Sequence, residues 1–162
     1  MADAHARLHQ LLDSSLPPLE AVQYLPIPAT RRTPLGIGRP SQRVWRDGQA
    51  LFGTTVLAAC SSLPLLMAVY GRLRSHALQG DADALNDLGW LWLNGTRLQG
   101  DVPLARRLLR LAFVLGSRDA AFNLAEQAWH GLGRPLDKAV AAQYYEAAQW
   151  PLVGLDRGRQ CR

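Results

Sequence analysis

Few residues of this chain stand at spacings that metal binding requires. His5 and His9 lie four positions apart, which would place two imidazoles on one face of a helix, where they can bind a metal ion. No third ligand accompanies them, so we interpret them as solvent-exposed histidines. Cys60 and Cys161 lie far apart in the sequence and have no metal-ligand spacing. The sequence therefore predicts no metal site and no cofactor.

Residue patterns that would support catalysis are also missing from the sequence. It contains no nucleophile elbow, phosphate-binding glycine loop, metalloprotease box or cysteine cluster. Gly36-Ile37-Gly38 follows no predicted strand, so it is not a dinucleotide-binding fingerprint. Asp101 and Asp137 are interpreted as helix caps rather than as a pair of catalytic carboxylates. We therefore expect a protein that is not an enzyme.

The strongest pattern in the chain is a repeat. The sequence GDADALNDLGWLWLNG begins at Gly80, and GSRDAAFNLAEQAWHG begins 36 positions later at Gly116. The two copies align without a gap, and Asp101 of the first recurs as Asp137 of the second. A fixed period of this length is typical of stacked helical units, because one unit alone cannot bury its apolar face.

The pattern of each copy predicts two helices joined by a loop. In the first copy, Asp81 or Asp83 caps the first helix, whose apolar residues recur at helical spacing. Gly95 ends that helix, Asp101 caps the second, and Gly116 closes the unit. The same offset extends backward to residues 44–79, which we interpret as a degenerate first copy.

These signals predict an all-α fold, an α/α solenoid of about three helix-pair repeats stacked in a right-handed sense. The predicted helix pairs lie near 47–79, 83–115 and 119–149. The repeat domain spans residues 44–151 and is divided into units at 44–79, 80–115 and 116–151. Residues 152–162 are predicted to form a C-terminal tail.

Residues 1–43 differ in composition from the remainder of the chain. Their composition predicts an irregular, proline-rich arm. A short helix is expected from Asp3 to Ser15. Six of the ten prolines follow, between Pro17 and Pro40, and proline fixes φ and restricts the preceding residue. This stretch also contains Arg39 and Arg43. We expect the arm to pack on the repeats through apolar residues, namely Val22, Tyr24, Leu25 and Ile27.

The two clear copies resemble the Sel-like repeat family, a tetratricopeptide-related α/α repeat. Residues 80–115 match its pattern at Gly80, Asp81, Ala82, Ala84, Leu88, Gly89, Gly95, Asp101, Ala105 and Ala112. Residues 116–149 match it at Gly116, Ala120, Leu124, Gly131, Gly133, Pro135, Asp137, Ala141, Tyr144, Tyr145 and Ala148. The chain departs from the pattern at Arg97, where a loop glycine is expected, and at Ala125, where a helix glycine is expected. The resemblance implies a bacterial adaptor or scaffold that holds a partner protein or peptide on a concave groove lined by first-helix side chains.

The register of the repeat places ten residues on this predicted groove. They are Asp83, Asn86, Asp87, Trp90, Asn94, Asn123, Glu126, Gln127, Trp129 and His130. Trp92 already fills the structural aromatic position, so we expect Trp90 to be the partner-binding anchor, since aromatic anchors dominate interface energies. The alternative is that Trp90 packs under the N-terminal arm. His130 also suits a helix C-terminus, where its partial charge complements the dipole.

The charge pattern favours a protein or peptide partner over nucleic acid. The chain carries a formal net charge of +5, with 18 basic residues that are all arginine except Lys138. No run of consecutive basic residues exceeds two, and aromatic residues do not interleave with them as on a single-strand binding platform. We therefore expect a scattered, solvated basic surface and no nucleic-acid partner.

One segment leaves the location of the protein open. Residues 48–71 carry no charge and are long enough to cross a bilayer, which takes about 20 apolar residues. Leu57-Ala58-Ala59-Cys60 also imitates a lipoprotein cleavage box. Polar residues interrupt the run, and the repeat offset explains it as a buried helix pair. The scarcity of cysteine favours a reducing compartment, so we expect a cytoplasmic protein. The alternative is a membrane-anchored or periplasmic envelope protein that uses residues 48–71 as anchor or signal and acts in assembly or secretion.

Overall fold

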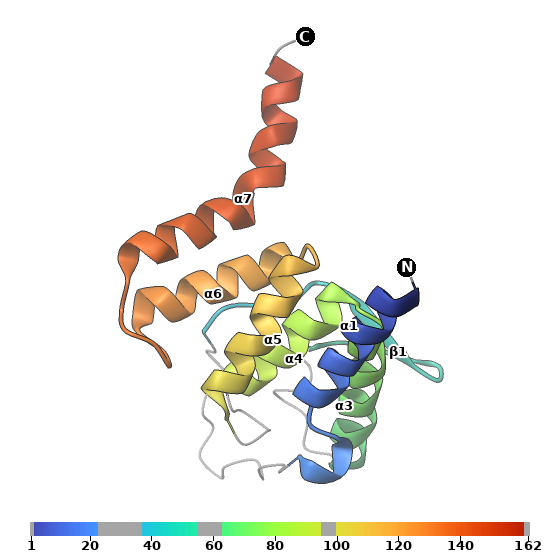
Figure 1. Ribbon diagram of the computed structural model, residues 1–162. Helices are drawn as coiled ribbons and strands as arrows, with labels where there is room; N and C mark the ends of the chain where they lie inside the picture. Colours follow the sequence, from blue (N-terminus) through green and yellow to red (C-terminus); the bar gives the residue numbers. More distant parts are fainter. Residues whose placement is uncertain (1, 23–36, 55–62, 95–99, 161–162) are drawn as a thin grey trace.

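The structure is a computed structural model that describes residues 2–22, 37–54, 63–94 and 100–160. It is mostly helical, as the sequence predicts, and Figure 1 shows its helices and one β-hairpin. In chain order the elements are α1 (Ala2–Ser15), the 3-10 helix η1 (Leu19–Ala21), β1 (Val44–Asp47), β2 (Ala50–Gly53), α3 (Leu63–Leu78), α4 (Ala82–Asn94), α5 (Val102–Val114), α6 (Arg118–His130) and α7 (Lys138–Gln160).

Helices α3 to α7 pack successively, each on the next along the chain (Figure 1). The closest packing joins α4 to α5 and α6 to α7. Asp101, before α5, donates a backbone hydrogen bond to Trp92 near the end of α4. A Cβ added to Gly89 would lie 2.8 Å from Leu109, so α4 approaches α5 as closely as a glycine allows. These two contacts show that α4 and α5 run antiparallel.

The turns between helices repeat with the period of the sequence. The backbone N–H of Asp101 donates to Trp92 O at 3.1 Å, and that of Asp137, 36 positions on, donates to Ala128 O at 2.9 Å. The carboxylates of Asp101 and Asp137 each accept from the backbone N–H three residues later, both at 3.0 Å. Both aspartates therefore cap the helices that follow them, as predicted.

The apolar core runs through the helices and includes part of the arm. Leu88 is fully buried on α4, where all residues from Ala84 to Leu93 are buried. Leu12 of α1 and Val22 of the arm join the same core cluster. The predicted contact through Val22 is thus confirmed, while Tyr24, Leu25 and Ile27 lie outside the described residues.

The prediction of a helix pair near 47–79 is wrong in its first half. Residues 44–53 form an antiparallel hairpin, in which Trp45 pairs with Phe52. Trp45 and Phe52 are buried while Val44 and Leu51 are exposed, which is the two-residue period of a strand. The dipeptide Gly48-Gln49 supplies the turn between the two strands, with Gly48 at φ +59°. The local turn signal outweighs the weak helical period of these residues. Helix α3 takes the place of the second helix of the predicted pair.

The structure divides the uncharged segment 48–71 between β2 and the beginning of α3, with residues 55–62, including Cys60, outside the described residues. Among the described residues, no helix combines the length and the apolar character that crossing a membrane would require.

The C-terminal helix extends beyond its predicted end. A tail was expected over residues 152–162, but α7 runs from Lys138 to Gln160. Figure 1 shows that α7 bends and that its C-terminal part projects away from the other helices. Pro151 lies within α7, and proline bends a helix because it lacks the N–H for one internal hydrogen bond.

Candidate functional site

The polar face of α4 and α6 holds another part of the same chain, residues 37–43, which we call the resident segment. The backbone N–H of Ile37 donates to Asn94 Oδ1 at 2.6 Å, and Asn94 Nδ2 donates to Ile37 O at 3.1 Å. The backbone N–H of Arg39 donates to Asn123 Oδ1 at 2.6 Å, and Asn123 Nδ2 donates to Arg39 O at 2.8 Å. Each amide side chain therefore pairs with both backbone groups of one residue, as a neighbouring strand would.

Asp87 holds the next alternate residue of the resident segment. Its Oδ1 accepts from the backbone N–H of Ser41 at 2.6 Å, and its Oδ2 accepts from Ser41 Oγ at 2.8 Å. The same Oδ2 accepts from Thr54 Oγ1 at 2.6 Å and from Trp45 Nε1 at 3.1 Å. A fully buried carboxylate thus joins the segment, the hairpin and α4. Burial raises the pKa of Asp87 above its ordinary value, and the hydrogen bonds it accepts oppose that rise.

Arg39 of the resident segment lies over α6. Its Nε donates to Asp119 Oδ1 at 2.7 Å. Its guanidinium carbon also lies 4.4 Å from the ring centroid of Phe122, which is cation–π distance. The two contacts come from the first and second turns of α6, so the beginning of this helix forms a site for an arginine side chain.

Arg43 lies over the beginning of α4 in the same manner. It forms an ion pair with Asp81, and its Nη1 is 3.9 Å from Asp83 Oδ2. Its guanidinium carbon lies 4.3 Å from the ring centroid of Trp45. Burial, followed by the charge of Asp81, raises the pKa of Asp83, and Arg43 lowers it.

Equivalent positions of the two repeats make equivalent contacts. Asp87 and Asn123 are 36 positions apart, and each accepts a backbone N–H of the resident segment at 2.6 Å. Asp83 and Asp119 are also 36 positions apart, and each faces an arginine of the segment. One binding unit therefore occurs twice: an aspartate at the helix start faces an arginine, and an acceptor one turn later takes a backbone N–H.

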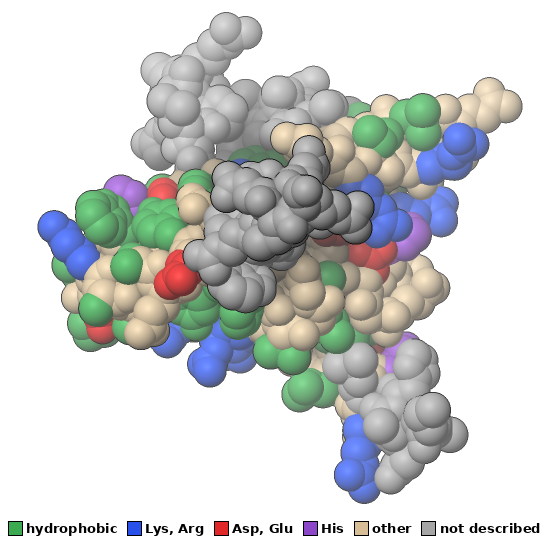
Figure 2. Space-filling model, turned by 90° about the horizontal axis from the view of Figure 1, so that it is seen from above, with side chains coloured by type: hydrophobic (Ala, Val, Ile, Leu, Met, Phe, Trp, Pro, Cys, Tyr) green, Lys and Arg blue, Asp and Glu red, His purple; other side chains and the backbone are tan. Residues whose placement is uncertain are grey.

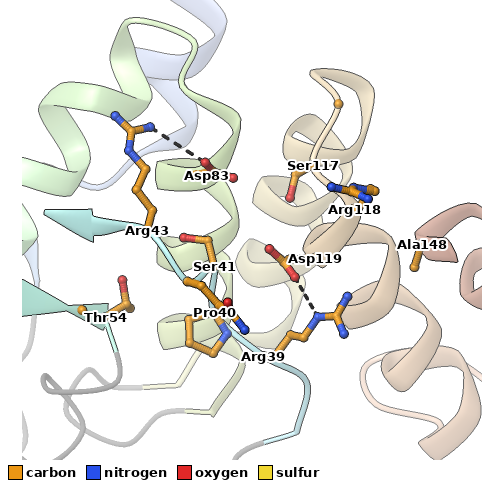
Figure 3. A pocket seen from close by; sticks show the side chains of 13 residues that line it. Arg39, Pro40, Ser41, Arg43, Thr54, Asp83, Ser117, Arg118, Asp119 and Ala148 are labelled. Atoms are coloured by element: carbon orange, nitrogen blue, oxygen red, sulfur yellow. Dashed lines mark hydrogen bonds and ion pairs between the residues drawn. The ribbon is translucent and has the colours of Figure 1, made fainter. Parts of the chain in front are cut away.

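A hollow of about 810 Å³ lies beside the resident segment. Figure 3 shows it between the beginnings of α4 and α6, with Ala148 on the far side. Its walls carry both charges, with the Arg43–Asp83 and Arg39–Asp119 pairs drawn as dashed lines. Arg118 adds a further basic group to its lining. The hollow is therefore a mixed-charge surface suited to a polar ligand.

The predicted groove residues fall into three groups. The first group contacts the resident segment and comprises Asp83, Asn86, Asp87, Asn94 and Asn123. The second group, Trp90 and Gln127, is buried. Trp90 is only 5% exposed, so it is a core residue rather than an exposed anchor, because α4 is covered on almost every side.

The third group lies where α6 meets α7, and comprises Glu126, Trp129 and His130. Tyr145 of α7 donates a hydrogen bond to Glu126, and His130 Nε2 lies 3.4 Å from Glu126 Oε2. Burial, with the hydrogen bond to Glu126, raises the pKa of Tyr145 to about 12. Trp129 is 43% exposed and packs edge-on against Tyr145, with Lys138 over its ring. None of these contacts involves the resident segment.

Sequence reasoning missed several residues of the site: Ser41, Thr54, Asp81, Asp119 and Phe122. The repeat offset from Asp83 leads directly to Asp119, so this residue could have been found. Ser41 and Thr54 stand in no pattern, and only the folded chain brings them to Asp87.

Metal-binding clusters are absent from the described part of the chain, where no group of three or more His, Cys, Asp and Glu side chains comes together. Figure 2 shows the Lys and Arg side chains of one face in several separate groups. Comparison with family profiles, curated proteins and solved structures finds nothing that matches this chain.

Proposed function

We propose that this protein is a non-enzymatic adaptor that binds a partner protein or peptide on the polar face of its helix pairs. In this proposal α4–α5 and α6–α7 are successive repeats of a short α/α solenoid of the Sel-like type. The 36-residue period of the turns and of the binding positions supports that interpretation.

The observation that carries the proposal is how Asn94 and Asn123 bind a peptide backbone. Each offers one acceptor and one donor to the C=O and N–H of a single residue. Alternate residues of the bound segment face the helices, and the chain turns once between the first two of them, at Gly38 with φ +76°. Such main-chain pairing supplies affinity for extended peptides, while side-chain contacts supply specificity.

The acidic groups of the face have a matching role in this proposal. Asp119 and Asp83 face arginine side chains, and Asp87 accepts four hydrogen bonds from its surroundings on the segment and the hairpin. Their contacts serve to position a bound chain. The face therefore works as a binding surface with two arginine sites.

Site-specific photo-crosslinking of the full chain in its native cells tests this function. A photoreactive amino acid at Arg118, which is exposed at the beginning of α6 and lines the hollow, is expected to give discrete adducts with a partner. The matched control places it at Arg107, which is exposed on α5 and does not line the hollow. Adducts of equal yield at both positions, or none at Arg118, would contradict the proposal.

A further inference from the structure

The resident segment is bound through polar contacts. Its arginines are partly exposed, with 48% of the Arg39 side chain and 40% of the Arg43 side chain accessible. Ile37 is partly buried and packs against the core cluster, and Ser41 is buried against Asp87. Ion pairs of such exposed side chains contribute little to stability. Another peptide can replace the backbone hydrogen bonds one for one, so the segment is held in a way that permits exchange.

The charges of the face identify the chemistry of a competing ligand. The helix starts provide the carboxylates of Asp81, Asp83 and Asp119, which lie opposite two arginines four positions apart. Between those arginines, the small hydroxyl side chain of Ser41 reaches the buried Asp87. A ligand that repeats these features carries the pattern Arg-x-Ser-x-Arg in an extended chain.

We infer that the resident segment is an intramolecular stand-in for a partner, and that an extended, arginine-containing segment of another polypeptide displaces it from α4 and α6. The inference rests on the proposed adaptor function and specifies its partner and its regulation. Until it is displaced, the segment occupies the face and lowers the apparent affinity for partners. The apparent affinity equals the intrinsic affinity multiplied by the fraction of molecules whose face is free.

Peptide binding to the purified full chain tests the inference. The probe is a fluorescent peptide with the sequence IGRPSQRV, which copies residues 37–44. The key variant is Gly38→Ala, because Gly38 has φ +76° and an added Cβ would lie 2.2 Å from Asn123 Oδ1. We expect this variant to release the segment and to bind the probe about tenfold more tightly than the wild type, as fluorescence anisotropy would report.

Gly48→Ala is the matched control for backbone strain. Gly48 also has a positive φ, +59°, but no atom lies within 4 Å of an added Cβ. This variant is expected to bind the probe like the wild type. A probe in which both arginines are replaced by glutamine is expected to bind Gly38→Ala about tenfold more weakly, since one decade is about 1.4 kcal/mol and two exposed ion pairs are lost.

A second variant keeps the test valid if Gly38→Ala does not fold. The double variant Arg39→Gln/Arg43→Gln changes only exposed side chains, so it should fold and still bind the arginine probe better than the wild type does. If no folded variant binds the probe while Arg118 still crosslinks a partner, the adaptor function stands and this inference fails. If Gly38→Ala forms a dimer in light scattering without added peptide, a second copy is the occupant, which also overturns the inference.

Discussion

The helix pairs and the resident segment are held by different forces. On α4, all residues from Ala84 to Leu93 are buried, and Gly89 lets α5 approach to contact distance. The resident segment is bound instead by backbone hydrogen bonds to amide and carboxylate side chains, and its arginines remain exposed. Apolar burial provides most of the stability of a fold, whereas polar contacts exchange with water or with another ligand at small net cost. Substitutions in the two regions should therefore have different consequences.

The largest effect is expected for a charge in the helical core. Leu88→Asp buries an uncompensated carboxylate at a position with no exposure and should unfold the protein, since the cost of several kcal/mol approaches the whole stability of a domain. Leu51→Asp, at a strand position that is 62% exposed, is the control and should change stability by at most about 1 kcal/mol. Thermal melts compare the two. A folded Leu88→Asp protein would contradict the packing of α4.

Substitutions at two tryptophans compare the core of the fold with its edge. Trp90→Ala removes a side chain that is 5% exposed and should cost about 3–5 kcal/mol. Trp129→Ala removes one that is 43% exposed and should cost much less. Urea denaturation measures both free energies of unfolding. Equal losses would show that burial does not distinguish α4 from the end of α6.

Asp87 links the two regions and makes stability depend on pH. Burial raises its pKa in the folded state, so the folded protein binds this proton more readily than the unfolded chain does. The resulting stabilisation is full below the ordinary pKa of about 3.9 and is lost as pH rises through the higher folded value. Urea midpoints of the wild type should therefore fall relative to those of Asp87→Asn as pH rises through this window. A difference that does not vary with pH would contradict the burial of a titrating carboxyl.

The smallest effect on stability is expected at the exposed arginines. Arg43→Gln removes the contacts with Asp81 and Asp83 and should change the free energy of unfolding by at most about 1 kcal/mol, because the side chain is 40% exposed. The change should shrink further as salt is added. Denaturation at low and high ionic strength measures it. A loss of several kcal/mol would show that the segment is part of the stable core.

The sequence predicted the helices better than the contacts that the resident segment makes with α4 and α6. The period that joins Asp101 to Asp137 identified the helix pairs, because caps and apolar positions are local signals. The hairpin was missed because the same residues carry two competing periods, and the turn at Gly48-Gln49 decides between them. The contact of Arg39 with Asn123 spans 84 positions, and no local pattern encodes a pairing at that distance.

Native-state hydrogen exchange tests the central claim, that the resident segment is held separately from the helical core. The backbone N–H groups of Arg39 and Ser41 should be protected, and their exchange should proceed by local opening that does not respond to low concentrations of denaturant. The N–H of Leu88 should exchange only with global unfolding. If Arg39 and Ser41 instead exchange with the same free energy and denaturant dependence as Leu88, the segment is an inseparable part of the fold and the claim is contradicted.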